Sequence, residues 1–182
     1  VYTIALVVRD PTACNEKDSS ITYVTIYSGV TANLSATSTP CTNTVNLSGS
    51  YSGTLGNTPP TFNLGDGSPT STLSSIAHTY TNNGVYTVSY VVTDNLGCQD
   101  LKTIQIPILN FKPGIVTEQS VCAGSSGTLN AEGGTEYTWT PSASLNTNNI
   151  ANPIANPSAN TIYTVQILNN SYGLNCSNTL TI

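Results

Sequence analysis

The sequence contains few side chains capable of acid–base chemistry, and two of them belong to one stretch of the chain. Asp66 stands between Gly65 and Gly67, and His78 is the single histidine of the chain. Asp66 could be a calcium ligand or a catalytic acid, and His78 could be a catalytic residue, although no serine, cysteine or metal partner is visible for it. Calcium, however, takes about six to eight oxygen ligands, and this stretch adds only the carboxylates of Asp94 and Asp100. We therefore interpret Asp66 as a turn-stabilising residue and at most a weak metal candidate, and His78 as a structural hydrogen-bonding residue.

Two further groups of side chains could bind or cleave a sugar. Glu132 and Glu136 are four residues apart, but Gly133-Gly134 between them argues against a shared helix face and a glycosidase-like carboxylate pair. Tyr137 and Trp139 alternate in a predicted strand, so they share one face and could form a sugar-binding platform. We favour a core position for Trp139. The sequence therefore predicts no catalytic residue, no enzyme activity and no cofactor.

Composition restricts the class of protein further. Only 7% of the 182 residues are charged and the net charge is −5, which argues against nucleic-acid binding. No apolar run reaches the roughly 18 residues that a membrane-spanning helix needs. Methionine is absent and no signal peptide is visible, so we interpret the sequence as an internal piece of a longer secreted protein.

The hydrophobic pattern indicates strands throughout. Phe62 and Leu64 alternate before a glycine-rich turn, and from residue 86 a longer run alternates with one buried face: Tyr86, Val88, Tyr90 and Val92. Asn-Pro pairs near residues 152–157 argue against a long helix there. No segment favours a helix, so the sequence predicts an all-β protein.

These motifs resemble the PKD domain, an immunoglobulin-like β-sandwich. The resemblance covers residues 27–107 and depends on an aromatic-x-aromatic-Gly-Asp-Gly stretch, a His-x-Tyr stretch and a Gly-x-Tyr-x-Val strand. Phe62 stands where the family usually has tryptophan, and Leu64 where it usually has phenylalanine. The residues that carry the pattern, or its looser C-terminal counterpart, are Phe62, Leu64, Gly65, Asp66, Gly67, His78, Tyr80, Tyr86, Trp139 and Tyr163.

Internal repeats divide the chain. Residues 2–10 resemble residues 86–94 at an offset of 86 − 2 = 84, and Cys14 and Cys98 keep the same offset, since 98 − 14 = 84. Trp139 and Tyr163 are as far apart as Phe62 and Tyr86. We therefore expect tandem sandwiches: residues 1–27 as the last two strands of an incomplete domain, residues 28–107 as a complete PKD-like domain, and residues 108–182 as an Ig-like or PKD-like domain. The short, proline-marked stretch 106–110 predicts a stiff junction.

The five cysteines can be paired by their equivalent positions in the repeats. This predicts the disulfides Cys41–Cys98 and Cys122–Cys176, and leaves Cys14 to pair with a cysteine upstream. Buried free thiols and a metal site are the alternatives, although the chain has no Cys-x-x-Cys motif. Disulfides indicate an extracellular location.

The C-terminal third also resembles Ig-like repeats of large bacterial surface proteins. Such repeats occur in Bacteroidetes adhesins, including gliding-motility adhesins of the SprB type that the type IX system exports. The resemblance implies a non-catalytic stalk or adhesive fibre at the cell surface. Its partners would be neighbouring repeats and, beyond them, surface polysaccharide or the secretion and motility machinery. The alternative is an accessory spacer or carbohydrate-binding region of a secreted chitinase or protease.

Overall fold

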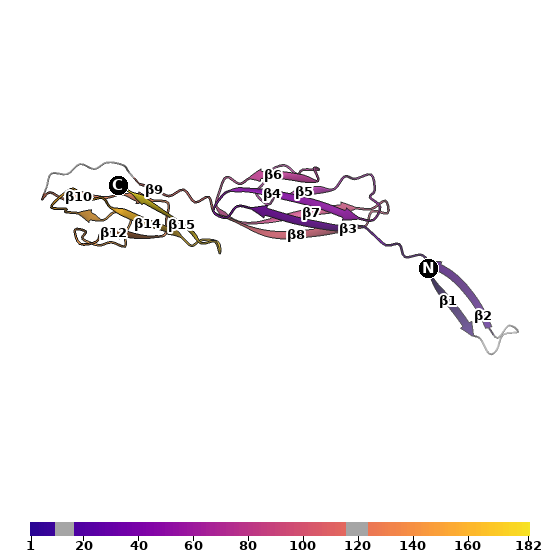
Figure 1. Ribbon diagram of the computed structural model, residues 1–182. Helices are drawn as coiled ribbons and strands as arrows, with labels where there is room; N and C mark the ends of the chain where they lie inside the picture. The colour runs from indigo at the N-terminus through magenta and orange to yellow at the C-terminus, as the bar shows by residue number, and fades with distance from the viewer. Residues whose placement is uncertain (10–16, 116–123) are drawn as a thin grey trace.

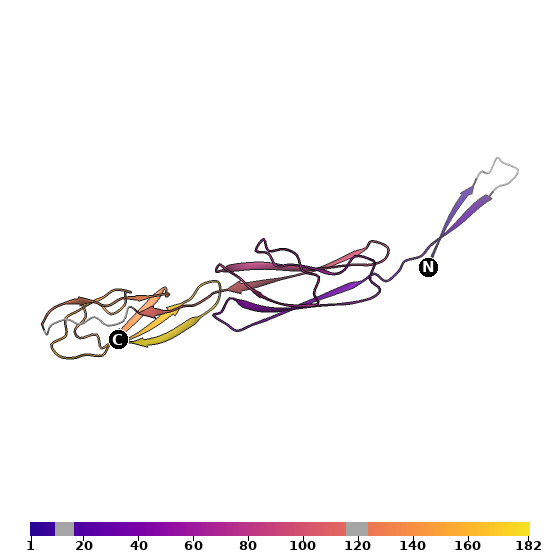
Figure 2. The ribbon, with the colours of Figure 1, turned by 90° about the horizontal axis from the view of Figure 1, so that it is seen from above.

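The computed structural model describes residues 1–9, 17–115 and 124–182, and within them every regular element is a β-strand. The all-β fold class predicted from the sequence is therefore confirmed. No helix in these ranges is long and apolar enough to cross a membrane. A hairpin, a central unit and a C-terminal unit follow one another along the molecule (Figures 1 and 2).

The central unit consists of two facing three-stranded sheets, all of whose pairings are antiparallel. One sheet has the order β3-β4-β6, with β3 at Thr31–Ser38, β4 at Thr44–Ser52 and β6 at Ser75–Thr79. The other has the order β5-β7-β8, with β5 at Thr61–Asn63, β7 at Gly84–Thr93 and β8 at Gln99–Ile108. Pro107 lies inside β8, an outer strand of its sheet, where a missing backbone N–H is tolerated. The expected junction 106–110 therefore begins later than predicted, after Ile108.

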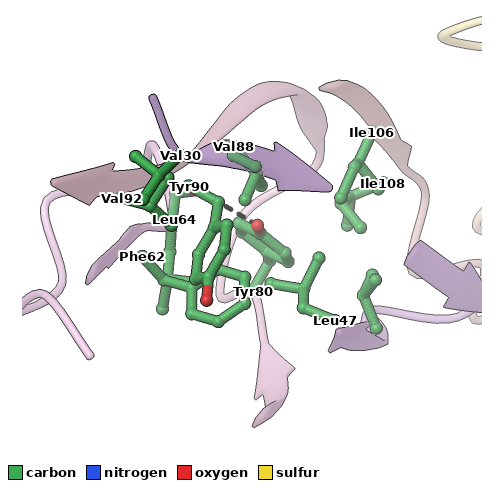
Figure 3. Close-up of a cluster of buried hydrophobic side chains, with 12 residues drawn as sticks. Val30, Leu47, Phe62, Leu64, Tyr80, Val88, Tyr90, Val92, Ile106 and Ile108 are labelled. Carbon is green, nitrogen blue, oxygen red and sulfur yellow. Dashed lines mark hydrogen bonds between the residues drawn. The ribbon is translucent and has the colours of Figure 1, made fainter. Parts of the chain in front are cut away.

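The core of the central unit lies between these sheets (Figure 3). Alternation in β7 brings Val88, Tyr90 and Val92 to the inner face, where each is at most 1% exposed. Phe62 from β5 is fully buried against Tyr90, with ring centroids 4.7 Å apart. A Cβ on Gly49 in β4 would come within 2.6 Å of the Tyr90 ring, so a glycine at this position makes room for the aromatic pair.

The C-terminal unit is built from shorter strands around its own core. Its main sheet has the order β12-β14-β15, with β12 at Glu136–Thr140, β14 at Thr164–Asn169 and β15 at Cys176–Thr181. Two small antiparallel pairs complete it: β9 (Gly114–Ile115) with β11 (Ala131–Glu132), and β10 (Gly127–Thr128) with β13 (Ile154–Ala155). Its buried side chains are Leu129, Ala131, Trp139, Ala155, Tyr163, Val165 and Ile167.

The N-terminal hairpin pairs β1 (Tyr2–Arg9) with β2 (Lys17–Val24). Tyr2 pairs with Val24, whereas the equivalent Tyr86 pairs with Ile106. The partner of Tyr2 is therefore two residues away from the one that the sequence repeat predicts. A shift of two residues keeps the same side chains on each face of the hairpin. The sequence repeat aligns four apolar side chains of β1 with the inward-facing residues of β7, and these side chains are 54–64% exposed: Tyr2, Ile4, Leu6 and Val8.

Candidate functional site: the Gly-Asp-Gly loop and the joint between the sandwiches

The loop after β5 is held by short-range hydrogen bonds. The Asn63 side chain accepts a bond from the Gly65 N–H at 2.9 Å, and Asp66 Oδ1 accepts one from the Ser68 N–H at 3.0 Å. Gly65 has φ +80°, and a Cβ there would lie 2.5 Å from the carbonyl oxygen of Thr87. Only glycine can therefore adopt this backbone so close to β7.

Asp66 and His78 form a pair. His78 Nε2 lies 2.7 Å from Asp66 Oδ2, and the side chains of His78 and Asp66 are 17% and 15% exposed respectively. Partial burial by itself would raise the pKa of the Asp66 carboxyl, but hydrogen bonds from His78 and Ser68, with the charge of His78, outweigh it and lower the pKa. The pair therefore fastens the loop to strand β6.

Two aromatic residues of the motif, Tyr80 and Tyr86, connect the Asp66–His78 pair to the core. The His78 and Tyr80 rings meet edge to face at 4.6 Å, and the Tyr80 and Tyr86 rings stack at 4.2 Å. The buried Tyr80 hydroxyl donates to the Leu64 carbonyl oxygen at 3.0 Å. Burial, followed by the charge of Asp66, raises the pKa of Tyr80 to about 12, so this phenol keeps its proton and its hydrogen bond. The motif residues thus join a loop, a strand and the core.

The metal and sugar candidates fall at separate places. Within the described residues no three His, Cys, Asp or Glu side chains gather as a metal site. Glu132 lies in the β9–β11 pair, whereas Glu136 lies in the main sheet and accepts a bond from Asn170. The Trp139 side chain is fully buried and its Nε1 donates to the Ile150 carbonyl at 2.9 Å. The Tyr137 hydroxyl is bonded to the Gly134 backbone, so these two rings form no exposed platform.

The disulfide pairing predicted from the repeats is wrong. The structure joins Cys41 to Cys176 across 135 residues of sequence and leaves Cys98 as an exposed free thiol among the residues that it describes. Of the predicted partners, Cys98 directly precedes strand β8, whereas the Cys41 carbonyl accepts a hydrogen bond from the Phe111 N–H, just after β8 ends. At about 3.3 Å per residue, this strand separates them by roughly 30 Å, whereas a disulfide requires Cα atoms within about 7 Å.

The other predicted bridge, Cys122–Cys176, is contradicted because Cys176 is already bonded to Cys41. Cys122 and Cys14 lie outside the described residues. The prediction assumed that each unit closes a disulfide between its own two cysteines. The observed bridge instead connects two units.

This bridge is part of a built joint. Cys41 lies in the turn between β3 and β4, at the end of the central unit that faces the C-terminal unit, and Cys176 is the first residue of β15. The connecting segment runs beside it: the Phe111 N–H donates to the Cys41 carbonyl at 3.2 Å, and the Asn110 N–H to Asn83 Oδ1 at 2.8 Å. Leu109 is 1% exposed. The two units are therefore connected at two points, by the chain and by a disulfide.

The sequence predicted a stiff junction between the two units but not the disulfide across it. Cys41 follows the first strand of the central unit, whereas Cys98 precedes its last strand. In an antiparallel sandwich with this strand order, those two turns lie at opposite ends. Strand order thus decides which end each cysteine occupies, and only an assignment of the sheets could have provided it.

A comparison with family models identifies the kind of domain in the central unit. Residues 30–108 match the model of the PKD domain. A comparison with curated proteins finds no match. Among solved structures, the PKD1 domain of Vibrio anguillarum Epp is 23% identical with a TM-score of 0.39, over 45% of this chain and 95% of that one.

PKD domains are non-catalytic modules in general and are commonly repeat or adhesion modules of extracellular proteins. The resemblance predicted from the Phe62-to-Asp94 pattern is thus confirmed, and the central unit of this chain is similar to the PKD domain.

Proposed function

We propose that this chain is a non-catalytic repeat segment of a long extracellular surface adhesin, in which its sandwiches serve as a stalk or adhesive fibre. The observation that carries this proposal is the Cys41–Cys176 bridge across the joint. A second covalent link between neighbouring units restricts bending and twisting, which benefits a part that holds something away from a surface. It would bring little advantage to a domain that folds and acts alone.

Three further features support the stalk. The units follow one another along the molecule rather than packing face to face (Figure 2). Each sandwich has its own core, so units can be added without a shared active site. The low share of charged residues leaves few groups for salt-dependent attraction between units.

The cellular setting belongs to the same proposal. The domain boundaries at residues 27 and 107, the type IX export route and a role in gliding are parts of it. The partners would be neighbouring repeat domains of the same chain and, at the adhesive end, surface polysaccharide or the motility machinery. Disulfides persist in oxidising compartments, which supports a location outside the cell.

The alternative, an accessory region of a secreted chitinase or protease, receives less support. Its carbohydrate-binding form relied on Tyr137 and Trp139, but the Trp139 ring is fully buried. A glycan-binding screen on Trp139→Ala and Tyr137→Ala would test it, because a sugar platform would lose binding without losing the fold.

Small-angle scattering of the whole chain tests the stalk. We expect an elongated particle whose maximum dimension is little changed by ionic strength, and a broader distribution of shapes after Cys41→Ser with Cys176→Ser. Cys98→Ser is the matched control, since its thiol is free. A compact particle with the two sandwiches side by side would refute the proposal.

A further inference from the structure

Cys98 is an exposed thiol at a defined place in the central unit. It lies in the turn between β7 and β8, at the end that faces the N-terminal hairpin, whereas Cys41 lies at the opposite end (Figure 1). The central unit therefore carries one cysteine at each end. The cysteine at one end already bridges to the next unit.

The turn around Cys98 is fixed. The Cys98 N–H donates to Asp94 Oδ1 at 2.8 Å, and its carbonyl accepts from the Asp94 N–H at 2.9 Å. Asp94 itself is only 7% exposed and also holds the Leu96 N–H at 2.8 Å. The thiol is thus presented on a rigid support and does not hang on a loose loop.

Cys98 corresponds in position to Cys176. Each stands after the turn between the last two strands of its unit, at the end that faces the preceding unit. Cys98 lies opposite Asp94 on the neighbouring strand, and Asp94 is two residues after the buried Val92. In the same way, Cys176 lies opposite Asn169, which is two residues after the buried Ile167. Two positions along a strand share a face, so each cysteine stands opposite a residue on the core face of its hairpin, with Cys176 buried and Cys98 exposed.

We propose that Cys98 forms a disulfide with a cysteine in the β3–β4 turn position of a preceding unit of the same kind. The Cys41–Cys176 bridge would then recur at the previous joint, as a head-to-tail link that repeats along the chain. This inference rests on the proposed function, since it supposes that such units follow one another. The hairpin β1–β2, whose sequence repeats that of β7–β8, marks where the preceding unit ends.

The bond forms by a balanced exchange. Two thiols lose two protons and two electrons and become one disulfide, and a disulfide oxidant accepts the electrons and becomes two thiols. Oxidised glutathione supplies this oxidant in the test below. The new bond is the sulfur–sulfur bond between Cys98 and the turn cysteine.

A graft onto the full chain tests the proposal. Residues 28–85 are placed before residue 2, which by the alignment of the two hairpins supplies the missing strands and a second copy of Cys41. The protein is refolded in a glutathione buffer, alkylated and mapped by non-reducing peptide analysis. We expect a peptide that links the grafted copy of Cys41 to Cys98, and near-complete loss of Cys98 alkylation relative to the original chain.

Two outcomes would overturn the proposal. Cys98 could remain alkylated in a graft that resists proteolysis, or the grafted cysteine could pair with Cys14 inside its own unit. The matched control carries Ser at the grafted position, and there Cys98 should again be alkylated. Scattering on the same graft separates the two proposals, because an extended particle with a free Cys98 would retain the stalk and discard the repeated bridge.

A second arrangement covers the case in which the graft does not fold. Residues 28–108 are placed before residues 29–182, so that two copies of the central unit, which has its own core, follow each other. The first copy's Cys41 should then link to the second copy's Cys98. If Cys98 of the second copy stays fully alkylated here, the proposal is wrong.

Discussion

Removing the bridge at the joint should destabilise both sandwiches, although the bond lies inside neither. In Cys41→Ser with Cys176→Ser, an unfolded C-terminal unit would be anchored only at Ile108. With the bridge present, the same unfolded segment between residue 108 and Cys176 is closed into a loop of about 70 residues, a length for which loop closure matters. An unfolded central unit is likewise closed between Cys41 and residue 108, into a loop of nearly the same length.

The magnitude follows from the chain entropy of these loops. Closing a loop of this length lowers the entropy of the unfolded state by an amount equivalent to about 4 kcal/mol at room temperature, and measured disulfide contributions are commonly about 2–4 kcal/mol. We therefore expect the free energy of unfolding of each unit to fall by roughly 2–4 kcal/mol. Small domains have only about 5–15 kcal/mol in total, so the change is easily measured.

The assay is urea unfolding followed at two wavelengths. Trp139 is the single tryptophan of the chain and lies in the core of the C-terminal unit, so its fluorescence reports that unit. Circular dichroism reports the strands of both units, so the central unit is read from the part of that signal that does not follow the Trp139 fluorescence. Cys98→Ser is the matched control and should change neither transition, because its thiol is free.

The result that would refute the reasoning is equally specific. If the cysteines paired within units, Cys98→Ser would destabilise the central unit as much as Cys41→Ser does, and the transition of the C-terminal unit would not respond to Cys41→Ser. Either finding would remove the basis for a stapled joint. Non-reducing peptide mapping of the unmutated chain provides the direct check on the pairing.

Three further outcomes follow from the central unit. Phe62→Ala should cost about 3–5 kcal/mol in urea unfolding because Phe62 is fully buried, whereas Val85→Ala, at a position that is 52% exposed, should cost less than about 0.5 kcal/mol. Gly65→Ala should lower the melting temperature more than Gly67→Ala. Both glycines have positive φ, but only at Gly65 would an added Cβ clash with the backbone, at the carbonyl oxygen of Thr87. Equal shifts in melting temperature would contradict this reasoning. The pKa of Asp66 is lower in the folded state than in the unfolded state, so its contribution to stability is present above the unfolded pKa and is lost as the pH falls through the folded pKa. Asp66→Asn should therefore reduce the loss of stability that occurs on acidification. If stability falls as steeply with decreasing pH in this variant, the pair with His78 adds nothing.

The local pattern of the sequence was enough to predict the strands of the central unit and which of their faces are buried. Alternation from Tyr86 to Val92 predicted which side chains enter the core, and Val88, Tyr90 and Val92 are buried. A period of two residues is a property of any strand, so it can be recognised without knowing the neighbours. The glycines around Asp66 predicted a turn for the same local reason, because positive φ is a property of single residues.

Tertiary structure alone decided what these elements meet. Nothing in the sequence indicated that the side chain of His78 turns toward Asp66 rather than to solvent, since that depends on β6 lying next to the loop after β5.

The cysteines mark this division most sharply. The similar spacing of the cysteines in successive units suggested a pair inside each unit. Spacing along the chain, however, does not determine distance in space. Cys98 directly precedes β8, whereas the Cys41 carbonyl accepts a hydrogen bond from Phe111 just after β8 ends, so the two cysteines are separated by the length of that strand. Cys41 instead meets Cys176, which is 135 residues away in sequence but faces it across the joint, because a disulfide depends on Cα atoms about 6 Å apart and not on equivalent positions in a repeat.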